Sequence, residues 1–417
     1  MNVNRTARLP ALRRAAYVQG MIEATASQPP PERLTADVAG HRLELLFNGA
    51  DRLERLRRLI ESAARSIDII MYIFDDDPVG RDIVARLVAA ARRGVRVRAV
   101  IDRFGSSDTP DSLFEPLRAE GGSVTFFSRR WRSSYLVRNH QKLLLFDGKI
   151  AVTGGFNIAE HYLSPPGREC WFDLGLLVEG SSVAEAAAWF EAVHAYTASN
   201  DGKLLMLRRM IREWPVRGAP VEWLVGGPTE RLSPWARAVR QDLDRGQRLD
   251  MAMAYFSPGQ GMLRRLGRVA RQGHARLIMA GKSDNAATIG ASRLLYGYLL
   301  RRHAEIWEYQ PCKLHMKLIV IDNVTYIGSA NFDARSLFVN VEIMLRIEDA
   351  EFAATMRDFV AAQERDCEVI TRQSHKARAG WLKRFRWTLA WFVVGVVDYT
   401  VSRRLNFGLA EPDLDAV

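Results

Sequence analysis

A motif that occurs twice constrains the fold of this chain more than any other feature. The stretch HQKLLLFDGKIAVTGGFN begins at His140, and HMKLIVIDNVTYIGSAN begins at His315. In both, a histidine and a lysine precede an apolar run that leads through an aspartate into a glycine-containing loop. An apolar run bounded by turn residues predicts a buried strand. The chain therefore carries the same strand and loop twice, 175 residues apart.

The elements around the two motifs repeat as well. A buried strand over 67–73, an apolar helical stripe and a strand over 95–102 precede the first motif. The same order returns with strands over 249–256 and 275–281, again separated by a helical segment. A separation of 175 residues corresponds to a whole domain and is too long for a solenoid repeat. The sequence therefore predicts two α/β domains made from one duplicated unit.

The domain boundaries follow from this repeat and from local composition. We expect an N-terminal extension at 1–41, the first domain at 42–203, a connecting segment at 204–220, the second domain at 221–372 and a basic, aromatic tail at 373–417. The Pro-rich stretch ASQPPPERLTADVAG is expected to be an exposed connection ahead of the first domain. The N-terminus has no uninterrupted apolar core, so it does not resemble a signal peptide.

Composition narrows the class of partner. The 417 residues are 48% hydrophobic, enough for sizeable cores, and carry a formal net charge of +11. This charge favours an anionic partner, which leaves nucleic acid, a membrane surface or a phosphorylated substrate open. The three cysteines, Cys170, Cys312 and Cys367, are far apart in sequence and fit neither a disulfide framework nor paired zinc ligands. We therefore expect a reducing, cytoplasmic compartment.

The motif residues suit a phosphate group. Residues two apart on a strand share a face, so each histidine is expected beside a lysine. The two pairs are His140 with Lys142 and His315 with Lys317. Glycines in the following loops allow close approach of a ligand, and Asn157 and Asn331 offer amide donors. Imidazole, ammonium and amide groups together favour charge-assisted hydrogen bonds to phosphate oxygens.

Two copies of the motif fit displacement at phosphorus. The attacking and leaving atoms lie on opposite sides of the phosphorus, so two facing histidines are needed. One neutral imidazole would form a phosphohistidine, and the other, protonated, would protonate the departing alcohol. A lone histidine beside an apolar strand is commonly structural, but the repeated pattern disfavours that interpretation. The motif lacks paired ligands at metal-coordinating spacing, so we expect no metal and no cofactor.

These residues resemble the doubled HxK(x)4D motif of the phospholipase D superfamily, with a match over roughly 42–372. The catalytic motif implied by the resemblance consists of His140, Lys142, Asp147, His315, Lys317 and Asp322. The second copy departs by one residue, because five residues separate Asp322 from Gly328 where six separate Asp147 from Gly154. The resemblance also implies a fold of two mixed sheets flanked by helices, related by a pseudo-twofold axis around one shared cleft. It implies that the first-half histidine is the nucleophile, although the two roles can be exchanged.

Other polar residues are expected to support the motif. We expect Asp147 and Asp322 to bind backbone N–H groups of the turn at the strand end. Asp173 and Glu342 resemble the carboxylates that hold a catalytic imidazole by its second nitrogen, with an ordinary strand carboxylate as the alternative. The predicted phosphate-binding residues are Asn157, Asn331, Ser329 and Arg138. A solvated arginine is the alternative for Arg138.

The tail bears on the substrate. Its apolar run over 387–397 has eleven residues, whereas a membrane-spanning helix needs about 20. Arginines, lysines and aromatic residues flank this run, which predicts an in-plane membrane anchor. The alternative is a helix packed on the protein's own surface. The segment 203–214 is a second basic amphipathic candidate, for which a core helix is favoured.

With this tail, the layout most resembles bacterial cardiolipin synthases of the phospholipase D type. The resemblance implies transfer of a phosphatidyl group between two phosphatidylglycerol molecules with release of glycerol. The expected partners are anionic phospholipids and a membrane surface, with no nucleic acid, on the cytoplasmic face of the bacterial inner membrane. The alternatives are a phospholipid hydrolase and a nuclease or DNA phosphodiesterase of the same superfamily.

Overall fold

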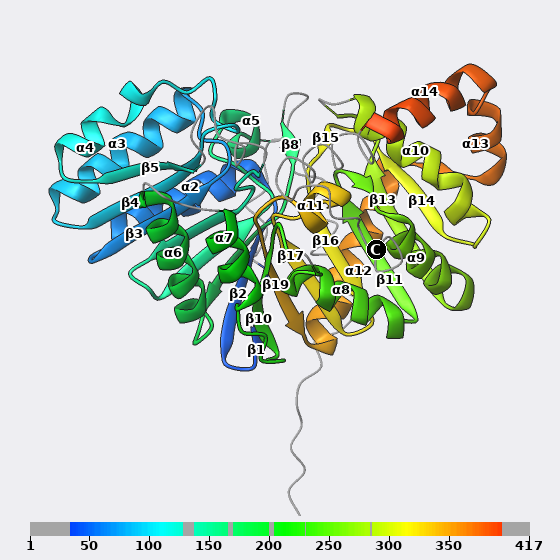
Figure 1. Ribbon diagram of the computed structural model, residues 1–417, viewed down its shortest axis with the longest axis horizontal. Coiled ribbons are helices and arrows are strands. Elements are labelled where there is room, and N and C mark those ends of the chain that lie inside the picture. Colours follow the sequence, from blue (N-terminus) through cyan, green and yellow to red (C-terminus); the bar gives the residue numbers. More distant parts are fainter. Residues whose placement is uncertain are drawn as a thin grey trace, which may run out of the picture.

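The computed structural model describes residues 34–127, 137–165, 170–199, 204–229, 231–283 and 286–393. It contains two eight-stranded mixed sheets that lie side by side, one in each half of the chain (Figure 1). The expectations for the first 33 residues, and those for the tail beyond Val393, lie outside the described residues.

The first sheet has the strand order β1-β2-β9-β7-β6-β3-β4-β5. Its strands are β1 Thr35–Val38, β2 His41–Leu46, β3 Ser66–Met71, β4 Arg96–Asp102, β5 Ser123–Phe127, β6 Lys142–Phe146, β7 Ile150–Gly154 and β9 Gly175–Glu179. Only the β3–β4 and β4–β5 pairs of this sheet are parallel. Parallel strands need a crossover, and α3 Pro78–Arg92 connects β3 to β4.

The second sheet has the order β10-β19-β17-β16-β11-β13-β14-β20. Its strands are β10 Val221–Gly226, β11 Arg248–Met253, β13 His274–Ala280, β14 Glu305–Tyr309, β16 Lys317–Ile321, β17 Val324–Gly328, β19 Glu342–Glu348 and β20 Cys367–Ile370. The run β2-β9-β7-β6-β3-β4-β5 of the first sheet corresponds, strand by strand, to the run β10-β19-β17-β16-β11-β13-β14 of the second. Neighbouring strands in the two runs have the same relative directions. The predicted α/β fold of two duplicated halves, each with a mixed sheet, is confirmed.

The two sheets differ at opposite edges. The first sheet adds β1, which pairs antiparallel with β2, and the second adds β20, which pairs antiparallel with β14. The stretch TADV, expected within an exposed connection, is therefore an edge strand. The apolar residue Val38 of this strand is buried, which accounts for its place in the sheet. The first sheet thus begins at Thr35, inside the segment expected as an extension.

The one-residue difference between the two motif copies falls in a hairpin turn. Phe146 pairs with Ile150 across three intervening residues, whereas Ile321 pairs with Val324 across two. Asp147 and Gly148 have positive φ angles, of 55° and 66°, in the three-residue turn, and Asp322 has a φ of 46° in the two-residue turn. The return strands β7 and β17 have equal lengths and end at the corresponding glycines. The missing residue therefore leaves the glycine loops in register.

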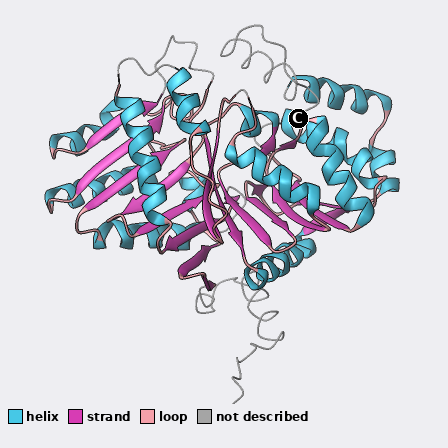
Figure 2. Cartoon of the chain, turned by 60° about the horizontal axis from the view of Figure 1, so that its bottom comes forward, coloured by secondary structure: helices cyan, strands magenta, loops and turns pink. Residues whose placement is uncertain are grey.

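Helices pack on both faces of each sheet (Figures 1 and 2). The remaining helices of the first half are α2 Gly49–Ser62, α4 Glu115–Ala119, α5 Glu160–Leu163 and α6 Val183–Ala198, and α7 Leu204–Arg212 follows them. The second half has α8 Pro234–Arg245, α9 Gln260–Gln272, α10 Ala286–Leu300, α11 Ala334–Phe338, α12 Ala350–Ala362, α13 Arg372–Arg378 and α14 Trp381–Trp391. Each half has an outer apolar cluster between its sheet and most of its helices, whereas α6, α7 and α12 pack on the other faces of the sheets.

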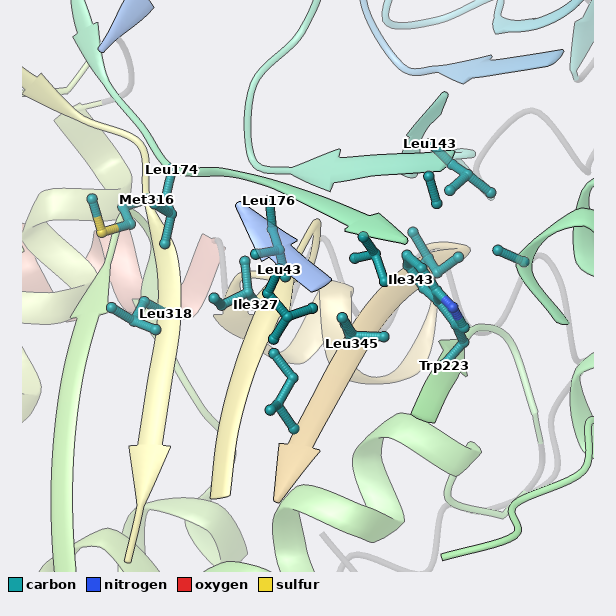
Figure 3. Packing of buried hydrophobic residues seen from close by; sticks show 14 of the residues in the cluster. Leu43, Leu143, Leu174, Leu176, Trp223, Met316, Leu318, Ile327, Ile343 and Leu345 are labelled. Atoms are coloured by element: carbon teal, nitrogen blue, oxygen red, sulfur yellow. The ribbon is translucent and has the colours of Figure 1, made fainter. Parts of the chain in front are cut away.

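A third apolar cluster joins the two halves. It contains Leu43, Leu143 and Leu176 from the first half together with Leu318, Ile327 and Leu345 from the second (Figure 3). Each of these side chains is at most 1% exposed. Burial of this much apolar surface between the sheets fixes their relative position, since removal of apolar area from water is the main stabilising term in folding.

Short strands also cross between the halves. β8 Trp171–Phe172 pairs in parallel with β15 Lys313–Leu314. The pairing places Cys170 beside Cys312, with their Sγ atoms 3.6 Å apart and no disulfide between them. These two cysteines are far apart in sequence but neighbours in the fold. The other short pair, β12 Phe256–Ser257 with β18 Phe332–Asp333, lies within the second half.

The amphipathic candidates are helical. In α7, Leu207 and Ile211 are buried in the apolar cluster that joins the two halves, while Leu205 is 70% exposed. The helix α14 lies against α10, and Trp387 stacks on His375 at 5.6 Å. Over the residues that the structure describes, no helix has both the length and the apolar character needed to cross a membrane.

Candidate active site

The two motif histidines lie at the boundary between the halves. Each stands two residues before its strand, His140 ahead of β6 and His315 ahead of β16. The backbone N–H of His140 donates to Val341 O at 2.9 Å, and that of His315 donates to Phe172 O at 2.8 Å. The backbone of the opposite half therefore fixes each histidine. In each case the accepting residue directly precedes a carboxylate residue, Glu342 or Asp173.

Each imidazole contacts the carboxylate of the opposite half. His140 Nδ1 lies 3.0 Å from Glu342 Oε1, and His315 Nδ1 lies 2.7 Å from Asp173 Oδ2. Glu342 and Asp173 are fully buried. A carboxylate that accepts from Nδ1–H fixes the tautomer and leaves Nε2 for chemistry. The arrangement depends on both halves, because neither half contains a complete pair.

The carboxylates are themselves held in place. Ser329 donates its hydroxyl to Glu342 Oε2 and accepts the N–H of Ile343 at 3.0 Å. Ser329 was expected at the substrate phosphate, but its hydroxyl is used by Glu342, so the structure places it behind the carboxylate. Asp173 Oδ1 accepts the N–H of Leu174 at 2.8 Å. A Cβ on Gly155 would meet that same oxygen at 2.4 Å, so glycine is required there.

The two lysines are buried beside the histidines. Lys142 Nζ donates to His140 O at 2.6 Å, and Lys317 Nζ lies 3.1 Å from His315 Nε2. Burial lowers the pKa of Lys142 well below its usual value, Glu342 opposes this shift, and the charge of Lys317 adds to it. Because Lys317 acts on both Lys142 and His140, the motifs of the two halves form one electrostatic unit.

The two histidine–carboxylate pairs differ in electrostatics. Burial lowers the pKa of His140 to about 4, against the opposing charge of Glu342 and with the help of Lys142. His140 is therefore neutral at pH 7, with a lone pair on Nε2. Burial raises the pKa of Asp173 to about 6, although Lys317 and Arg52 favour its ionised form. Burial also acts to raise the pKa of Glu342, but His140 and Lys142 lower it more, so Glu342 stays ionised.

The asparagines of the glycine loops are buried near the strand ends. Asn157 Oδ1 accepts the N–H of Ile73 at 3.1 Å. Asn331 is 3% exposed, and its Oδ1 has no hydrogen-bond partner among the described residues. A buried, unpaired amide oxygen is costly unless a ligand or water pairs with it. Asn331 therefore presents a polar group that a substrate hydroxyl can satisfy, or its amide nitrogen can turn to a phosphate.

Arg138 and Tyr72 lie on the His140 side. The Arg138 guanidinium lies over the Phe104 ring, 3.8 Å from its centroid. The Tyr72 ring is 4.7 Å from the His140 ring, and the Lys142 ammonium is 4.9 Å from the Tyr72 ring. Burial raises the pKa of Tyr72 to about 12, and Arg138 opposes this shift. Tyr72 was missed in the sequence because it directly follows β3, far along the chain from the motif.

Three aromatic residues that the motif did not indicate lie around His315. The rings of Tyr162 and Trp171 are each 5.0 Å from the His315 ring, and that of Tyr255 is 6.1 Å away. Tyr162 follows the first glycine loop in FNIAEHY, and Trp171 directly precedes FDL. The only sequence feature that could have indicated Tyr162 and Trp171 is their position shortly after the first motif. Their contact with His315 could not be predicted, because His315 belongs to the second half.

The motif aspartates lie outside this site. Asp147 accepts the backbone N–H groups of Arg65 and Ser66, at 2.7 and 2.9 Å, and Asp322 accepts that of Arg248 at 2.9 Å. These amides lie at the starts of β3 and β11, not in the aspartates' own turns, which corrects the expected partner. The five-residue strand between lysine and aspartate separates these carboxylates from the imidazoles. Their contacts tie the hairpin to its neighbouring strand.

The described part of the site offers no cluster of metal ligands. Among the described residues, no group of three or more His, Cys, Asp or Glu side chains is placed to hold a metal ion. The carboxylates nearest the imidazoles are each engaged by a histidine Nδ1. The prediction of a metal-free reaction remains a prediction that needs a chelation experiment.

The chain is similar to known proteins over most of its length. The family model described as cardiolipin synthase, PLD-like domain, matches residues 56–194 and 239–363. Cardiolipin synthase B of Escherichia coli (strain K12) is 28% identical over 365 residues, which cover 82% of this chain and 85% of that relative. Cardiolipin synthase A of Pseudomonas fluorescens is 30% identical over 352 residues, covering 81% of this chain and 72% of the relative.

A solved structure shares the fold. The crystal structure of phosphatidylserine synthase from Haemophilus influenzae Rd KW20 matches with a TM-score of 0.68 at 14% identity, over 87% of this chain and 94% of that one. At this identity the likeness concerns the fold alone. The family model, in contrast, matches more than half of the chain and spans both motif copies. The chain therefore belongs to the family of phospholipase D-like cardiolipin synthase domains.

Proposed function

We propose that this protein makes cardiolipin by transferring a phosphatidyl group from one phosphatidylglycerol to the free glycerol hydroxyl of another, with release of glycerol. The observation that carries the proposal is the pair of exchanged contacts, His140 with Glu342 and His315 with Asp173. Two imidazoles with oriented Nε2 atoms and buried lysines beside them suit displacement at a phosphodiester. The names of the relatives, cardiolipin synthases A and B, support the choice of lipid substrate.

In the proposed first step His140 is the nucleophile. Its pKa of about 4 keeps the ring neutral at pH 7, and Glu342 orients the attacking Nε2. Nε2 attacks phosphorus, the bond to the glycerol oxygen breaks, and His315 gives its proton to that oxygen. The ammonium groups of Lys142 and Lys317 stabilise the non-bridging oxygens, together with Asn157 and Asn331.

In the second step His315 acts as the base. Its Nε2 takes the proton of the acceptor hydroxyl while that oxygen attacks the phosphohistidine, and His140 is released. Asp173 stabilises the imidazolium that forms, because it lies 2.7 Å from Nδ1. Water in place of the acceptor would give phosphatidic acid, so the product depends on which hydroxyl enters.

A membrane surface is the proposed partner, through α14. Its Trp381, Leu382 and Phe385 are 78%, 58% and 65% exposed, and the basic residues Lys383 and Arg386 on the same helix are exposed as well. Exposed aromatic and aliphatic side chains interleaved with cations favour insertion into the headgroup region of an anionic bilayer. This helix also packs on α10, so it combines the expected anchor with the expected surface helix. We propose a peripheral position on the cytoplasmic face of the membrane.

The test is a product analysis with the full chain. Purified protein is incubated with vesicles of labelled phosphatidylglycerol, with and without excess chelator, and the lipids are separated. We expect cardiolipin and free glycerol in equal amounts in both cases, and neither product from His140→Ala or His315→Ala. Phosphatidic acid without cardiolipin would favour the hydrolase instead. Cleavage of single-stranded or duplex DNA in place of lipid turnover would favour the nuclease.

A further inference from the structure

The environment of His315 differs from that of His140. Tyr162, Trp171 and Tyr255 form what we term the aromatic enclosure, with ring centroids 5.0, 5.0 and 6.1 Å from that of His315. The Tyr162 and Trp171 rings also contact one another at 4.9 Å. The His315 side chain is 5% exposed, against 10% for His140. Apolar ring surface thus surrounds the imidazole that handles the alcohol in the proposed reaction.

A phenol faces the reacting nitrogen. Tyr162 Oη lies 3.4 Å from His315 Nε2, the atom left for chemistry once Asp173 holds Nδ1. An alcohol oxygen that exchanges a proton with Nε2 must lie within about 3.2 Å of that atom. Tyr162 Oη and this oxygen would then both lie beside Nε2, an arrangement that allows Tyr162 to bind a neighbouring hydroxyl on the same alcohol.

A buried arginine holds the enclosure in place. Arg52, which is 1% exposed, donates to Tyr162 O at 2.8 Å and to Asp173 O at 2.7 Å. One guanidinium therefore fixes the backbone of both groups that contact the two nitrogens of His315. A side chain held by such bonds in a dry site is preorganised and requires little rearrangement when substrate binds.

We infer that the aromatic enclosure is the acceptor-alcohol subsite, which selects a vicinal diol over a simple alcohol and either of them over water. The inference rests on the proposed transfer function and specifies its acceptor. In the selected step the phosphorus bond to His140 Nε2 breaks, a bond from phosphorus to the acceptor oxygen forms, and the acceptor proton moves to His315 Nε2. The rings bury the carbon chain, at about fourfold preference per CH₂ over water. The Tyr162 hydroxyl binds the second hydroxyl of the diol.

The experiment measures how the phosphatidyl-enzyme partitions among acceptors. Phosphatidylglycerol vesicles are incubated with equal concentrations of 1-propanol and 1,2-propanediol, and the two phosphatidyl alcohols and phosphatidic acid are quantified. All three products arise from one intermediate, so their ratios are independent of the donor step and of the fraction of folded enzyme. A variant that only reduces the amount of folded enzyme would lower all three products equally.

Two variants and one control test the subsite. Tyr162→Phe keeps the ring and removes the hydroxyl, so we expect the diol preference to fall about threefold to tenfold, as for one lost neutral hydrogen bond, with an unchanged ratio of propanol product to phosphatidic acid. Trp171→Leu should lower both alcohol products relative to phosphatidic acid. The control is Tyr298→Phe, a change in a tyrosine of α10 whose ring lies under the Arg302 guanidinium. It should leave every ratio as in the unmodified enzyme.

The outcomes separate the inference from the proposed function. Cardiolipin formation together with unaltered ratios in Tyr162→Phe and Trp171→Leu would overturn the subsite alone. Phosphatidyl alcohols with the expected shifts, but no cardiolipin, would leave the subsite standing and refute the proposed acceptor. The absence of any phospholipid turnover would overturn both. If Trp171→Leu fails to fold, the isosteric Tyr162→Phe still decides the role of the hydroxyl.

Discussion

At the scale of residues, the site is asymmetric although the motif is repeated. Both histidines have a carboxylate on Nδ1, but Glu342 is longer than Asp173 and is held by the hydroxyl of Ser329. Asp173 instead has a buried guanidinium behind it, that of Arg52. We propose that such differences divide two chemically equal imidazoles into a neutral nucleophile and a proton carrier.

This asymmetry predicts the pH dependence. Because the pKa of Asp173 is raised to about 6, Asp173 gains a proton below that pH and loses the charge that stabilises protonated His315. We expect kcat/KM to fall about tenfold per pH unit below pH 6, as for loss of one ionised group. Asp173→Asn should lower kcat by roughly 10²-fold or more and remove this acid limb. A profile that stays flat down to pH 5 would exclude Asp173 as the controlling group.

The motif aspartates allow a test of structure against catalysis. Asp147→Ala removes the acceptor of the Arg65 and Ser66 N–H groups and leaves a residue without side-chain polarity at a φ of 55°. We expect the free energy of unfolding to fall by about 1–3 kcal/mol, with kcat within threefold of the original value. Asp147→Asn, which tolerates this backbone conformation and keeps one acceptor oxygen, should lose less. Denaturant unfolding together with an activity assay distinguishes an effect on stability from one on catalysis. A hundredfold drop in kcat in a fully folded variant would show that Asp147 takes part in catalysis.

At the scale of elements, most of the fold could be predicted from the pattern of apolar residues in the sequence. The apolar strands and helical stripes around the motifs are periodic, so the duplicated sheet could be predicted from local sequence. The edge strand β1 could not, because its pattern is polar and its place depends on pairing with β2. The cross-half pair β8 with β15 has two residues in each strand, which is too short for any periodicity to show.

The helix α14 makes a prediction at this scale. Trp381→Ala combined with Phe385→Ala removes two exposed rings without touching the packed face. We expect partition onto anionic vesicles to weaken on the order of 1,000-fold, since burial of each such ring contributes about 2 kcal/mol and the variant removes two. The matched control is Val216→Ala with Val369→Ala, which removes exposed apolar groups elsewhere on the surface. Vesicle sedimentation measures both proteins, and equal binding of the double variant and the unmodified protein would contradict the docking role of α14.

At the scale of the whole molecule, the site exists only where the halves meet. The sequence indicated His140, His315, Glu342 and Asp173, but which carboxylate serves which histidine depends on the packing of the two sheets. The same holds for the aromatic enclosure and for the approach of Cys170 to Cys312. Apart from the contact of Tyr255 with His315, which lies within the second half, these contacts join residues more than a hundred positions apart, and local patterns contain no information about them.

The central claim is that one imidazole from each half acts on the same phosphorus, with His140 as the nucleophile. The most direct measurement uses a phosphatidyl donor whose leaving group is p-nitrophenol, which departs without a proton, followed by an alkaline quench and peptide mapping. In His315→Ala the covalent adduct should form and accumulate on His140, because no base activates the acceptor, and it should be absent from His140→Ala. An adduct on His315, or turnover that persists in His140→Ala, would contradict the account.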